Sequence, residues 1–325
     1  MEAAFAEDKG VRTREFWLNL GNKLVAEGHD EATVVAHLQP ILEAILKMKS
    51  DAAGEAEGEA DEAEGSTEED APKAKSKGKG KRAPAAADLK TDLYFYSKAE
   101  REAFEKLARE SLADGSPMAT KKVLPAIGDL PLSGDIALFG RMVAQANSLT
   151  VEGAVQVAHP FTVSKVIEED DYFIAADDLS SQGAGHIAAN GFGAGLYYGY
   201  VNVDVPLLVK NLDGSKEQAR QLLTALIEAV ATVAPGGKQN SFSARSYATY
   251  LLAEVGSAQP RSFADAFLTP VSAEPLAETA IAKLEKAKGS LEKAFPSQVT
   301  KHACLNRITE EGSFSDIVAL LDELL

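Results

Sequence analysis

The sequence predicts an α+β protein in which a helical part comes first and a sheet-bearing part follows. Two observations support this class. Apolar residues recur at helical spacing before residue 50, whereas valine, phenylalanine, tyrosine and glycine dominate from Gly134 onward. The 325 residues, 45% of them hydrophobic, are enough for one large domain or two smaller ones, each with a buried core.

The N-terminal part reads as two helices. The first is expected over residues 11–27 and the second from about Asp30, where apolar side chains recur every three or four positions. These are Val34, Val35, Leu38, Ile41, Leu42, Ile45 and Leu46.

Residues 51–90 interrupt this helical part. Residues 51–70 carry ten acidic residues and no basic one, and residues 71–90 carry seven basic residues and one acidic one. With no aromatic and almost no large aliphatic residue, the segment cannot offset the entropy lost on ordering, so we expect it to be disordered. Its basic half, Lys73 to Arg82, is either a nucleic-acid contact or a solvated linker attracted to the acidic half.

After the insert, "LYFYS" predicts a short strand. Ser97 and Glu100 then form a capping box that begins a helix ending near Leu112.

From Gly134 the pattern predicts strands and long hairpins through "YVNVDVPLLV". A helix follows, capped by Ser215 and Gln218, with a predicted apolar face. That face comprises Ala219, Leu222, Leu223, Leu226, Ile227 and Val230. The segment "PGGKQNSFSARSYATYLLAEVG" reads as a glycine-rich loop leading into a strand. The rest is predicted to be mostly helical, ending with Ile317, Leu320, Leu321 and Leu324 inward.

Charge and cysteine content limit the function classes. A net charge of −16 argues against a general nucleic-acid binder, although a groove needs only a local excess of lysine and arginine. Cys304 is the single cysteine, so no intramolecular disulfide forms, and His302 beside it is too little for a zinc site. No apolar run is long enough to span a bilayer and the N-terminus does not read as a signal peptide. We expect a cytoplasmic protein with no membrane partner, no metal and no cofactor.

An enzyme reading rests on the segment around "DDLSSQGAGH". Asp177, Asp178, Ser180 and His186 are the residue types of an acid–base–nucleophile set or of a hard-metal site. Their spacing matches no ligand pair on a helix face, and the surrounding glycines indicate a loop too flexible to hold them. The alternative is a solvated turn, and we predict no catalytic residue.

Two segments carry candidate binding residues. In "PGGKQNS", Gly236 and Gly237 allow backbone amides to approach an anion and Lys238 supplies charge, so the segment is either a phosphate contact or a plain connecting loop. In "FGRMVAQ", at the end of a predicted strand, Arg141 can pair with a phosphate or stack on a base, and Met142 offers an apolar wedge. The alternative there is an exposed arginine and a core methionine.

Five segments, taken together, resemble one family in order and in spacing. They are "DIALFGRMV", "VEGAVQVAHPFTVSKV", "DDYFIAADDL", "GAGHIAANGFGAGLYYGYVNVDV" and "PGGKQNSFSA". The family is CasC, the repeated backbone subunit of the type I-E CRISPR surveillance complex called Cascade. The resemblance spans roughly residues 90–270, with weaker agreement over 1–50.

The resemblance implies a modified RNA-recognition-motif-like (ferredoxin-like) palm with a helical finger insertion and a long β-hairpin thumb. Copies of the subunit line up along one CRISPR RNA, and each thumb folds over the guide and displaces a nucleotide, in antiviral defence. Target DNA then pairs with the guide, so that base pairing reads the sequence. The implied partners are CRISPR RNA, target DNA, copies of the chain, other Cascade subunits and, indirectly, a recruited helicase–nuclease. The implied layout is residues 1–50 finger, 51–90 insert, 91–133 finger and return, 134–158 palm, 159–197 thumb, and 198–325 palm and C-terminal helices.

Site residues carry over by position. The resemblance implies guide contacts by Arg141 and Met142, a place near the guide backbone for Lys238, Gln239 and Ser241, and a thumb that touches the neighbouring subunit. Lys165 and His186 join the predicted RNA-binding set, and Arg245 is added on charge alone. A basic groove of Arg141, Lys165 and Lys238 is expected.

The chain departs from the family pattern at its N-terminus, and the insert over residues 51–90, in the variable finger, is a second and lesser departure. Family members begin with a strand and a basic segment, whereas the similar region begins here at about Ala4. We expect that the sequence is truncated here, that another chain supplies the missing segment, or that this chain binds the guide poorly. A metal-dependent hydrolase using Asp177, Asp178 and His186, and a purely protein-binding subunit, are the alternatives to the scaffold.

Overall fold

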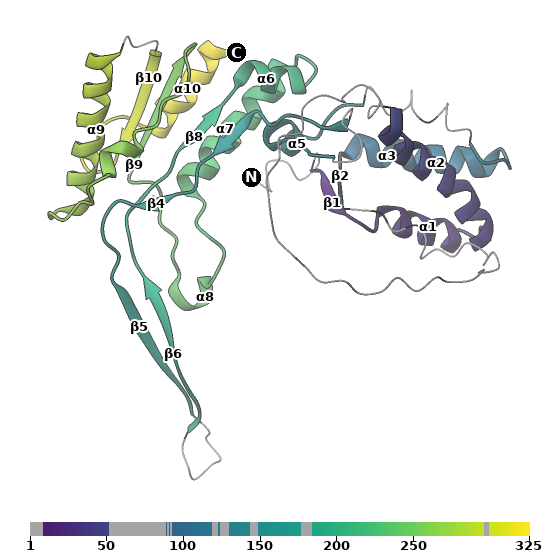
Figure 1. Cartoon of the computed structure of the whole chain (residues 1–325), viewed down its shortest axis with the longest axis horizontal. Coiled ribbons are helices and arrows are strands. Elements are labelled where there is room, and N and C mark those ends of the chain that lie inside the picture. The colour runs from purple at the N-terminus through teal and green to yellow at the C-terminus, as the bar shows by residue number, and fades with distance from the viewer. Residues whose placement is uncertain are drawn as a thin grey trace, which may run out of the picture. The chain divides into compact units, whose positions relative to one another are not determined.

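The computed structural model contains helices and short antiparallel strands, which confirms the α+β class (Figure 1). The structure describes residues 9–51, 89, 91, 93–118, 123, 130–143, 149–176, 184–295 and 299–325. The predicted disordered insert lies almost wholly outside these residues. The chain divides into two compact units, and each is described by itself. The N-terminal unit is residues 2–154 and 204–219, and the hairpin unit is residues 155–203 and 220–325.

The N-terminal unit is built around a two-stranded sheet and three helices. Strand β1 (Val11–Thr13) pairs antiparallel with β2 (Tyr94–Tyr96). Helices α1 (Phe16–Ala26), α2 (Glu31–Asp51) and α3 (Lys98–Ala113) pack over one core. The predicted helix over 11–27 was therefore wrong in its first residues, because β-branched Val11 and Thr13 pair with β2 and the helix begins only at Phe16.

The core of this unit confirms the predicted apolar face of α2. Val34, Val35, Leu38, Ile41 and Leu42 are all buried. They pack with an aromatic cluster in which the rings of Trp17 and Phe104 lie 5.0 Å apart. The burial of Ile45 and Leu46 lies outside the described side chains.

The strand predicted after Gly134 is a helix instead. Helix α5 (Gly134–Phe139) begins after Ser133 and ends at Gly140, whose φ is +75°. Ile136, Ala137 and Leu138 are all buried, so this short run has no polar face, and periodicity cannot distinguish a buried helix from a buried strand.

The hairpin unit begins with three antiparallel strand pairs. Strands β3 (Val155–Val157) and β8 (Val201–Val203) form one pair, and β4 (Phe161–Thr162) and β7 (Tyr197–Tyr198) the next. Between them lies a long hairpin of β5 (Glu168–Ala176) and β6 (Ala184–Gly193) (Figure 1). The predicted hairpin excursion is thereby confirmed.

After β8 the chain turns into helices. Asp204 caps α6 (Val205–Asn211) by accepting a hydrogen bond from the Leu207 amide, so the second half of "YVNVDVPLLV" is helical and not a strand. In α7 (Lys216–Thr232), Ser215 accepts from the Gln218 amide as predicted, while Val230 is exposed.

The C-terminal part contains the predicted strand, β9 (Tyr250–Gly256), and a second strand, β10 (Val299–Asn306), where helix was predicted. Helix α8 (Gln239–Phe242) is followed by β9, which pairs with β10. The 3-10 helix η3 (Ala264–Phe267), α9 (Leu276–Ala294) and α10 (Phe314–Leu324) complete the unit. Within the described ranges, strands pair only two by two, and the RNA-recognition-motif-like palm stays a prediction. None of the described helices is long and apolar enough to cross a membrane.

Candidate nucleic-acid interface

The first candidate surface is the turn that follows α5 in the N-terminal unit. Gly140 ends the helix, and Arg141 then exchanges backbone hydrogen bonds of 2.9 and 2.8 Å with Val151. A side chain at Gly140 would lie 2.6 Å from the Val151 carbonyl oxygen and 2.7 Å from the Gly153 amide nitrogen. The turn therefore requires glycine both for its positive φ and for this close approach.

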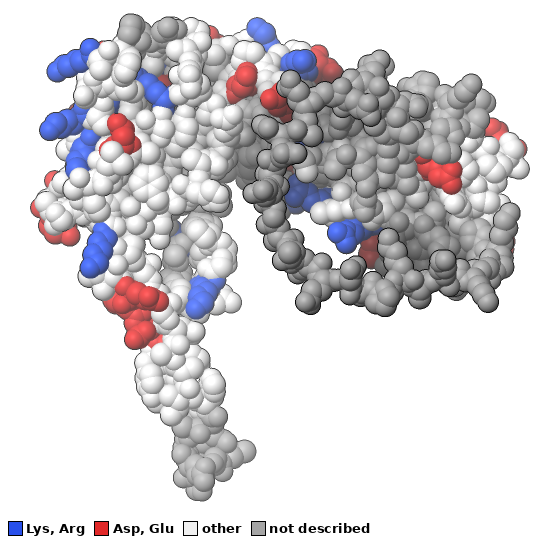
Figure 2. Space-filling model, in the orientation of Figure 1, with Lys and Arg blue, Asp and Glu red and all other residues white. Residues whose placement is uncertain are grey.

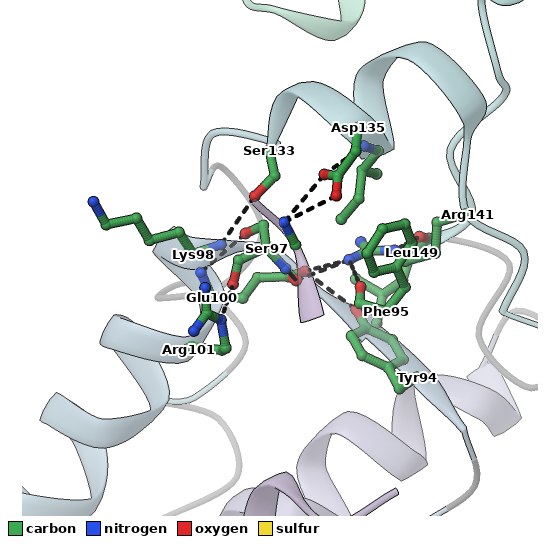
Figure 3. A network of polar contacts seen from close by, with 12 residues as sticks. Tyr94, Phe95, Ser97, Lys98, Glu100, Arg101, Ser133, Asp135, Arg141 and Leu149 are labelled. Carbon is green, nitrogen blue, oxygen red and sulfur yellow. Dashed lines mark hydrogen bonds and ion pairs between the residues drawn. The ribbon is translucent and has the colours of Figure 1, made fainter. Parts of the chain in front are cut away.

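The side chain of Arg141 points into the unit (Figure 3). Its Nη1 donates to the Glu100 carboxylate at 2.8 Å and to the Phe95 carbonyl at 2.9 Å. Its Nε donates to the Leu149 carbonyl at 3.1 Å, and the guanidinium carbon lies 4.8 Å from the centre of the Tyr94 ring. Only 4% of each charged side chain of the Arg141–Glu100 pair is exposed.

Glu100 belongs to the capping box predicted from the sequence, which the structure confirms. Its carboxylate accepts from the Ser97 amide at 2.7 Å, and the Ser97 hydroxyl accepts from the Glu100 amide at 3.0 Å. The same carboxylate accepts from the Tyr94 hydroxyl at 3.1 Å. Burial, together with the charge on Glu100, raises the pKa of Tyr94, so this phenol stays a hydrogen-bond donor.

This geometry corrects the reading of "FGRMVAQ" in three respects. The segment follows a helix and not a strand, Arg141 is buried and not exposed, and Met142 is 85% exposed and not in the core. One reading of the sequence has this guanidinium pair with a phosphate or stack on a base; in the structure it is hydrogen-bonded within the unit and lies over the Tyr94 ring. No local pattern indicates this ion pair, because Glu100 lies 41 residues before its partner.

Next to Met142 lies a cavity of about 450 Å³, whose lining includes Arg12, Phe95, Phe139 and Thr150. The Arg12 guanidinium carbon lies 4.9 Å from the centre of the Phe95 ring. Nucleobases stack on aromatic rings and on the arginine guanidinium, and an exposed thioether offers them a polarizable apolar contact. The sequence did not predict these two site residues, because Arg12 lies in a three-residue strand within the segment predicted as a helix, and the strand pattern of "LYFYS" around Phe95 indicates no binding role.

The second candidate surface is the "PGGKQNSFSA" loop of the hairpin unit. Lys238, Ser241 and Arg245 are exposed, and Gln239 is half-buried. The Gln239 amide donates to the Ala244 carbonyl at 3.1 Å and also to the Pro235 carbonyl, which closes the loop on itself. Lys238 adopts a left-handed conformation, with φ of +52°.

Aromatic rings join this loop to the base of the hairpin. Phe242 stacks on Phe192 of β6 with centroids 5.1 Å apart, and the Lys238 ammonium lies 5.6 Å from the centre of the Phe242 ring. The structure therefore brings together a basic loop and the β5–β6 hairpin. The sequence predicts the loop and the hairpin, but no local pattern predicts the contact between them.

The other predicted site residues of this unit lie along the hairpin. Lys165 is exposed just before β5, and His186 is exposed on β6, with its ring 6.0 Å from that of Phe173. The predicted groove of Arg141, Lys165 and Lys238 draws on both units; the Arg141 side chain is buried within its own unit, and the parts of Lys165 and Lys238 in such a groove stay predictions.

Acidic residues also lie on the hairpin. Glu168, Glu169, Asp170 and Asp171 are all exposed at the start of β5, and Figure 2 shows acidic side chains gathered near the base of the hairpin. Of the proposed hydrolase residues, Asp177, Asp178 and Ser180 lie outside the described residues. Among the residues that are described, no three His, Cys, Asp or Glu side chains are grouped to hold a metal ion.

Comparison with solved structures identifies the class of protein that has this fold. One similar chain belongs to a structure described as "CRISPR RNA-guided surveillance complex, pre-nicking", with 25% identity and a TM-score of 0.74. The match covers 100% of this chain and 86% of that chain. A second, from a "CRISPR RNA-guided surveillance complex", is 30% identical with a TM-score of 0.52 over 63% of this chain and 80% of that chain.

The family follows from the sequence model described as "CT1975-like protein", which matches residues 1–323. The chain belongs to this family, and its resemblance to CasC is confirmed. A comparison with proteins of curated function found no match.

Proposed function

We propose that this chain is a non-catalytic scaffold subunit that assembles along a CRISPR guide RNA and presents it for pairing with target DNA. The observation that carries this proposal is the similarity to a chain of an RNA-guided surveillance complex over the whole length of this one. The chemical make-up of each candidate surface supports it, because exposed cationic, aromatic and thioether groups suit a nucleic-acid strand better than a closed catalytic pocket.

In this proposal the β5–β6 hairpin is the thumb, and the loop around Lys238 holds the guide backbone at its base. The Phe192–Phe242 stack supports this assignment, because it ties the hairpin to the loop. Met142, 85% exposed beside the cavity, is the apolar wedge against a base. Phosphate contacts by Lys165, Lys238 and Arg245 supply the charge term.

The remaining features of the proposal concern the assembly. Copies of the chain contact one another along the guide, other Cascade subunits complete a type I-E complex, and a recruited helicase–nuclease cuts the target. In this proposal the chain works in the cytoplasm, in antiviral defence. No cleavage by this chain is required.

The test is co-expression of this chain with a CRISPR RNA and the partner subunits, followed by sizing before and after ribonuclease. A large particle that contains RNA and shrinks with ribonuclease is the expected result. If each copy neutralises about three phosphates, log affinity falls with log salt at a slope of about −2 per copy. Lys238→Gln lowers both the yield of the particle and the slope, whereas Lys106→Gln, an exposed lysine on α3, changes neither.

Two other outcomes contradict the proposal. Oligomers without RNA that ignore ribonuclease indicate a purely protein-binding subunit. Metal-dependent cleavage of a labelled RNA that disappears in Asp178→Asn indicates a hydrolase.

A further inference from the structure

We propose that Arg141 acts on the guide without touching it: with Glu100 it forms a positioning pair that fixes the turn presenting Met142. This inference rests on the proposed function, and it replaces a direct contact of Arg141 with the guide by an indirect one.

The Arg141 guanidinium donates hydrogen bonds to three different segments of the N-terminal unit. Nη1 binds the carbonyl of Phe95 in β2 and the carboxylate of Glu100 in α3, and Nε binds the carbonyl of Leu149. With 4% of its side chain exposed and Tyr94 covering its face, the guanidinium offers no open surface to a phosphate.

The fixed side chain of Arg141 determines the direction of the Met142 side chain. Around the Arg141–Val151 bridge the backbone is extended, and successive side chains of extended backbone point to opposite sides. Because the Arg141 side chain points inward, Met142 points outward and is 85% exposed; both residues, with Phe95, contribute to the lining of the cavity.

Helix α5, which precedes the turn, is also held in place at its N-terminal end. In the first turn of α5, Asp135 accepts from the Gly10 amide at 3.0 Å (Figure 3). The Ser133 hydroxyl, just before the helix, accepts from the Lys98 amide at 3.0 Å. Since both ends of α5 are fixed to neighbouring segments, the turn has little freedom once the Arg141–Glu100 pair has formed.

The energetic cost of the buried Arg141–Glu100 pair also favours a positioning role. Burying an ion pair is costly, and replacing such pairs by well-packed apolar residues is often neutral or stabilising. Stability alone is thus a weak reason for a pair with both side chains 4% exposed. A fixed direction for the neighbouring exposed residue is what the pair adds to the turn.

The experiment uses the double variant Glu100→Gln/Arg141→Met. It leaves no unpaired buried charge and retains a side-chain oxygen that can accept the Ser97 amide. Glu102→Gln, an exposed glutamate on the same helix, is the matched control. Binding of a fluorescein-labelled oligouridylate is measured over a range of salt concentrations, and urea unfolding of every variant is measured beside it.

The expected result is binding weakened about tenfold in the double variant, which corresponds to the loss of one well-packed contact. The slope of log affinity against log salt stays that of the wild type. Lys238→Gln, by contrast, lowers the magnitude of the slope by about 0.7, the value for one phosphate on a single strand. Met142→Ser in the double variant adds little further loss, because Met142 is no longer held in place.

Three results overturn the inference. A slope that falls in the double variant as it does in Lys238→Gln means that Arg141 touches phosphate. Unchanged affinity with unchanged slope means that the pair only supports the fold. Absence of RNA binding by the wild-type chain overturns the proposed function itself, and the inference with it.

Should the double variant unfold, Arg141→Lys decides the question. It keeps the charge but loses the fork that reaches both carbonyls, of Phe95 and of Leu149. Positioning predicts weakened binding at an unchanged salt slope, and near wild-type affinity contradicts it.

Discussion

The ring of Phe192, on β6, stacks on the ring of Phe242, the last residue of α8, with centroids 5.1 Å apart and planes 27° apart. Fifty positions separate them in the chain, and the contact joins the hairpin to the loop that carries Lys238, Gln239 and Ser241. The Lys238 ammonium lies over the Phe242 ring, 5.6 Å from its centre. The position of the basic loop therefore depends on the hairpin.

This contact predicts an energetic coupling between the two rings. Phe192→Ala and Phe242→Ala each lower the free energy of unfolding, and the double variant loses less than the sum by about 0.5–1.5 kcal/mol, the usual value of an aromatic pair. Urea unfolding of the four proteins in the cycle measures it. Phe173→Ala, on the same hairpin but paired with His186, combines additively with Phe242→Ala. Additive losses for Phe192 and Phe242 would show that the stack contributes no stability.

The turn after α5 predicts an unusual cost for alanine at Gly140. Gly115 also has positive φ, +67°, but nothing lies within 4 Å of an added methyl group there. Gly115→Ala therefore measures the backbone cost alone, about 1–2 kcal/mol. Gly140→Ala costs clearly more, because its methyl group meets the Val151 carbonyl oxygen at 2.6 Å. Equal urea midpoints for the two variants would mean that the turn relaxes without strain.

Much of the fold follows from local pattern. The α2 face of Val34, Val35 and Leu38, the capping box of Ser97 and Glu100, and the Ser215 cap are confirmed because each depends on residues within one or two turns. Each of these signals lies within a short stretch of the chain, so it can be read from a single sequence without knowledge of the fold.

Most of the errors originate in long-range packing, and one originates in a short buried run without a readable period. Strand β10 forms because β9, more than forty residues earlier, offers a partner, and no local pattern records this. Arg141 is buried because Glu100 and the Phe95 carbonyl, 41 and 46 residues earlier in the chain, satisfy its guanidinium together with the nearby Leu149 carbonyl, and no local pattern shows those two distant partners. Helix α5 has no polar face from which its period can be read.

An exposed cluster between α1 and α3 predicts a pH dependence of stability. The Arg109 guanidinium, hydrogen-bonded to Glu27, lowers the pKa of that carboxyl below its ordinary 4.5. Lys23, and then Arg109, lower the pKa of Glu105 in the same way. Because these folded-state pKa values are depressed, the stabilisation is present above pH 4.5 and is lost as the pH falls through them.

The test is urea unfolding as a function of pH. Arg109→Gln weakens the acid-side fall in midpoint that begins at about pH 4.5, and lowers the midpoint slightly at neutral pH, since exposed ion pairs contribute little. Lys106→Gln, on the same helix, leaves the acid-side fall as it is in the wild type. An identical pH profile for Arg109→Gln and wild type would assign the fall to other carboxylates.

The acidic start of β5 predicts that charge on one face of the hairpin opposes RNA binding. Glu169 lies opposite Phe192 in the register, and Asp171 lies two residues further along on the same face, which is the face that meets Phe242 and the Lys238 loop. Glu168 and Asp170 lie on the other face of the same strand. Glu169→Gln/Asp171→Asn therefore tightens oligouridylate binding at low salt by roughly twofold for each carboxylate removed, the scale of an exposed charge interaction.

The matched control is Glu168→Gln/Asp170→Asn, which makes the same change in charge on the opposite face. Its gain is smaller, and both gains disappear at high salt, because screening shortens the reach of exposed charges to about 3 Å at 1 M. Fluorescence titrations of the two double variants at low and high salt measure the difference. Equal gains would mean that the RNA responds to the net charge of the hairpin and not to the face joined to the Lys238 loop.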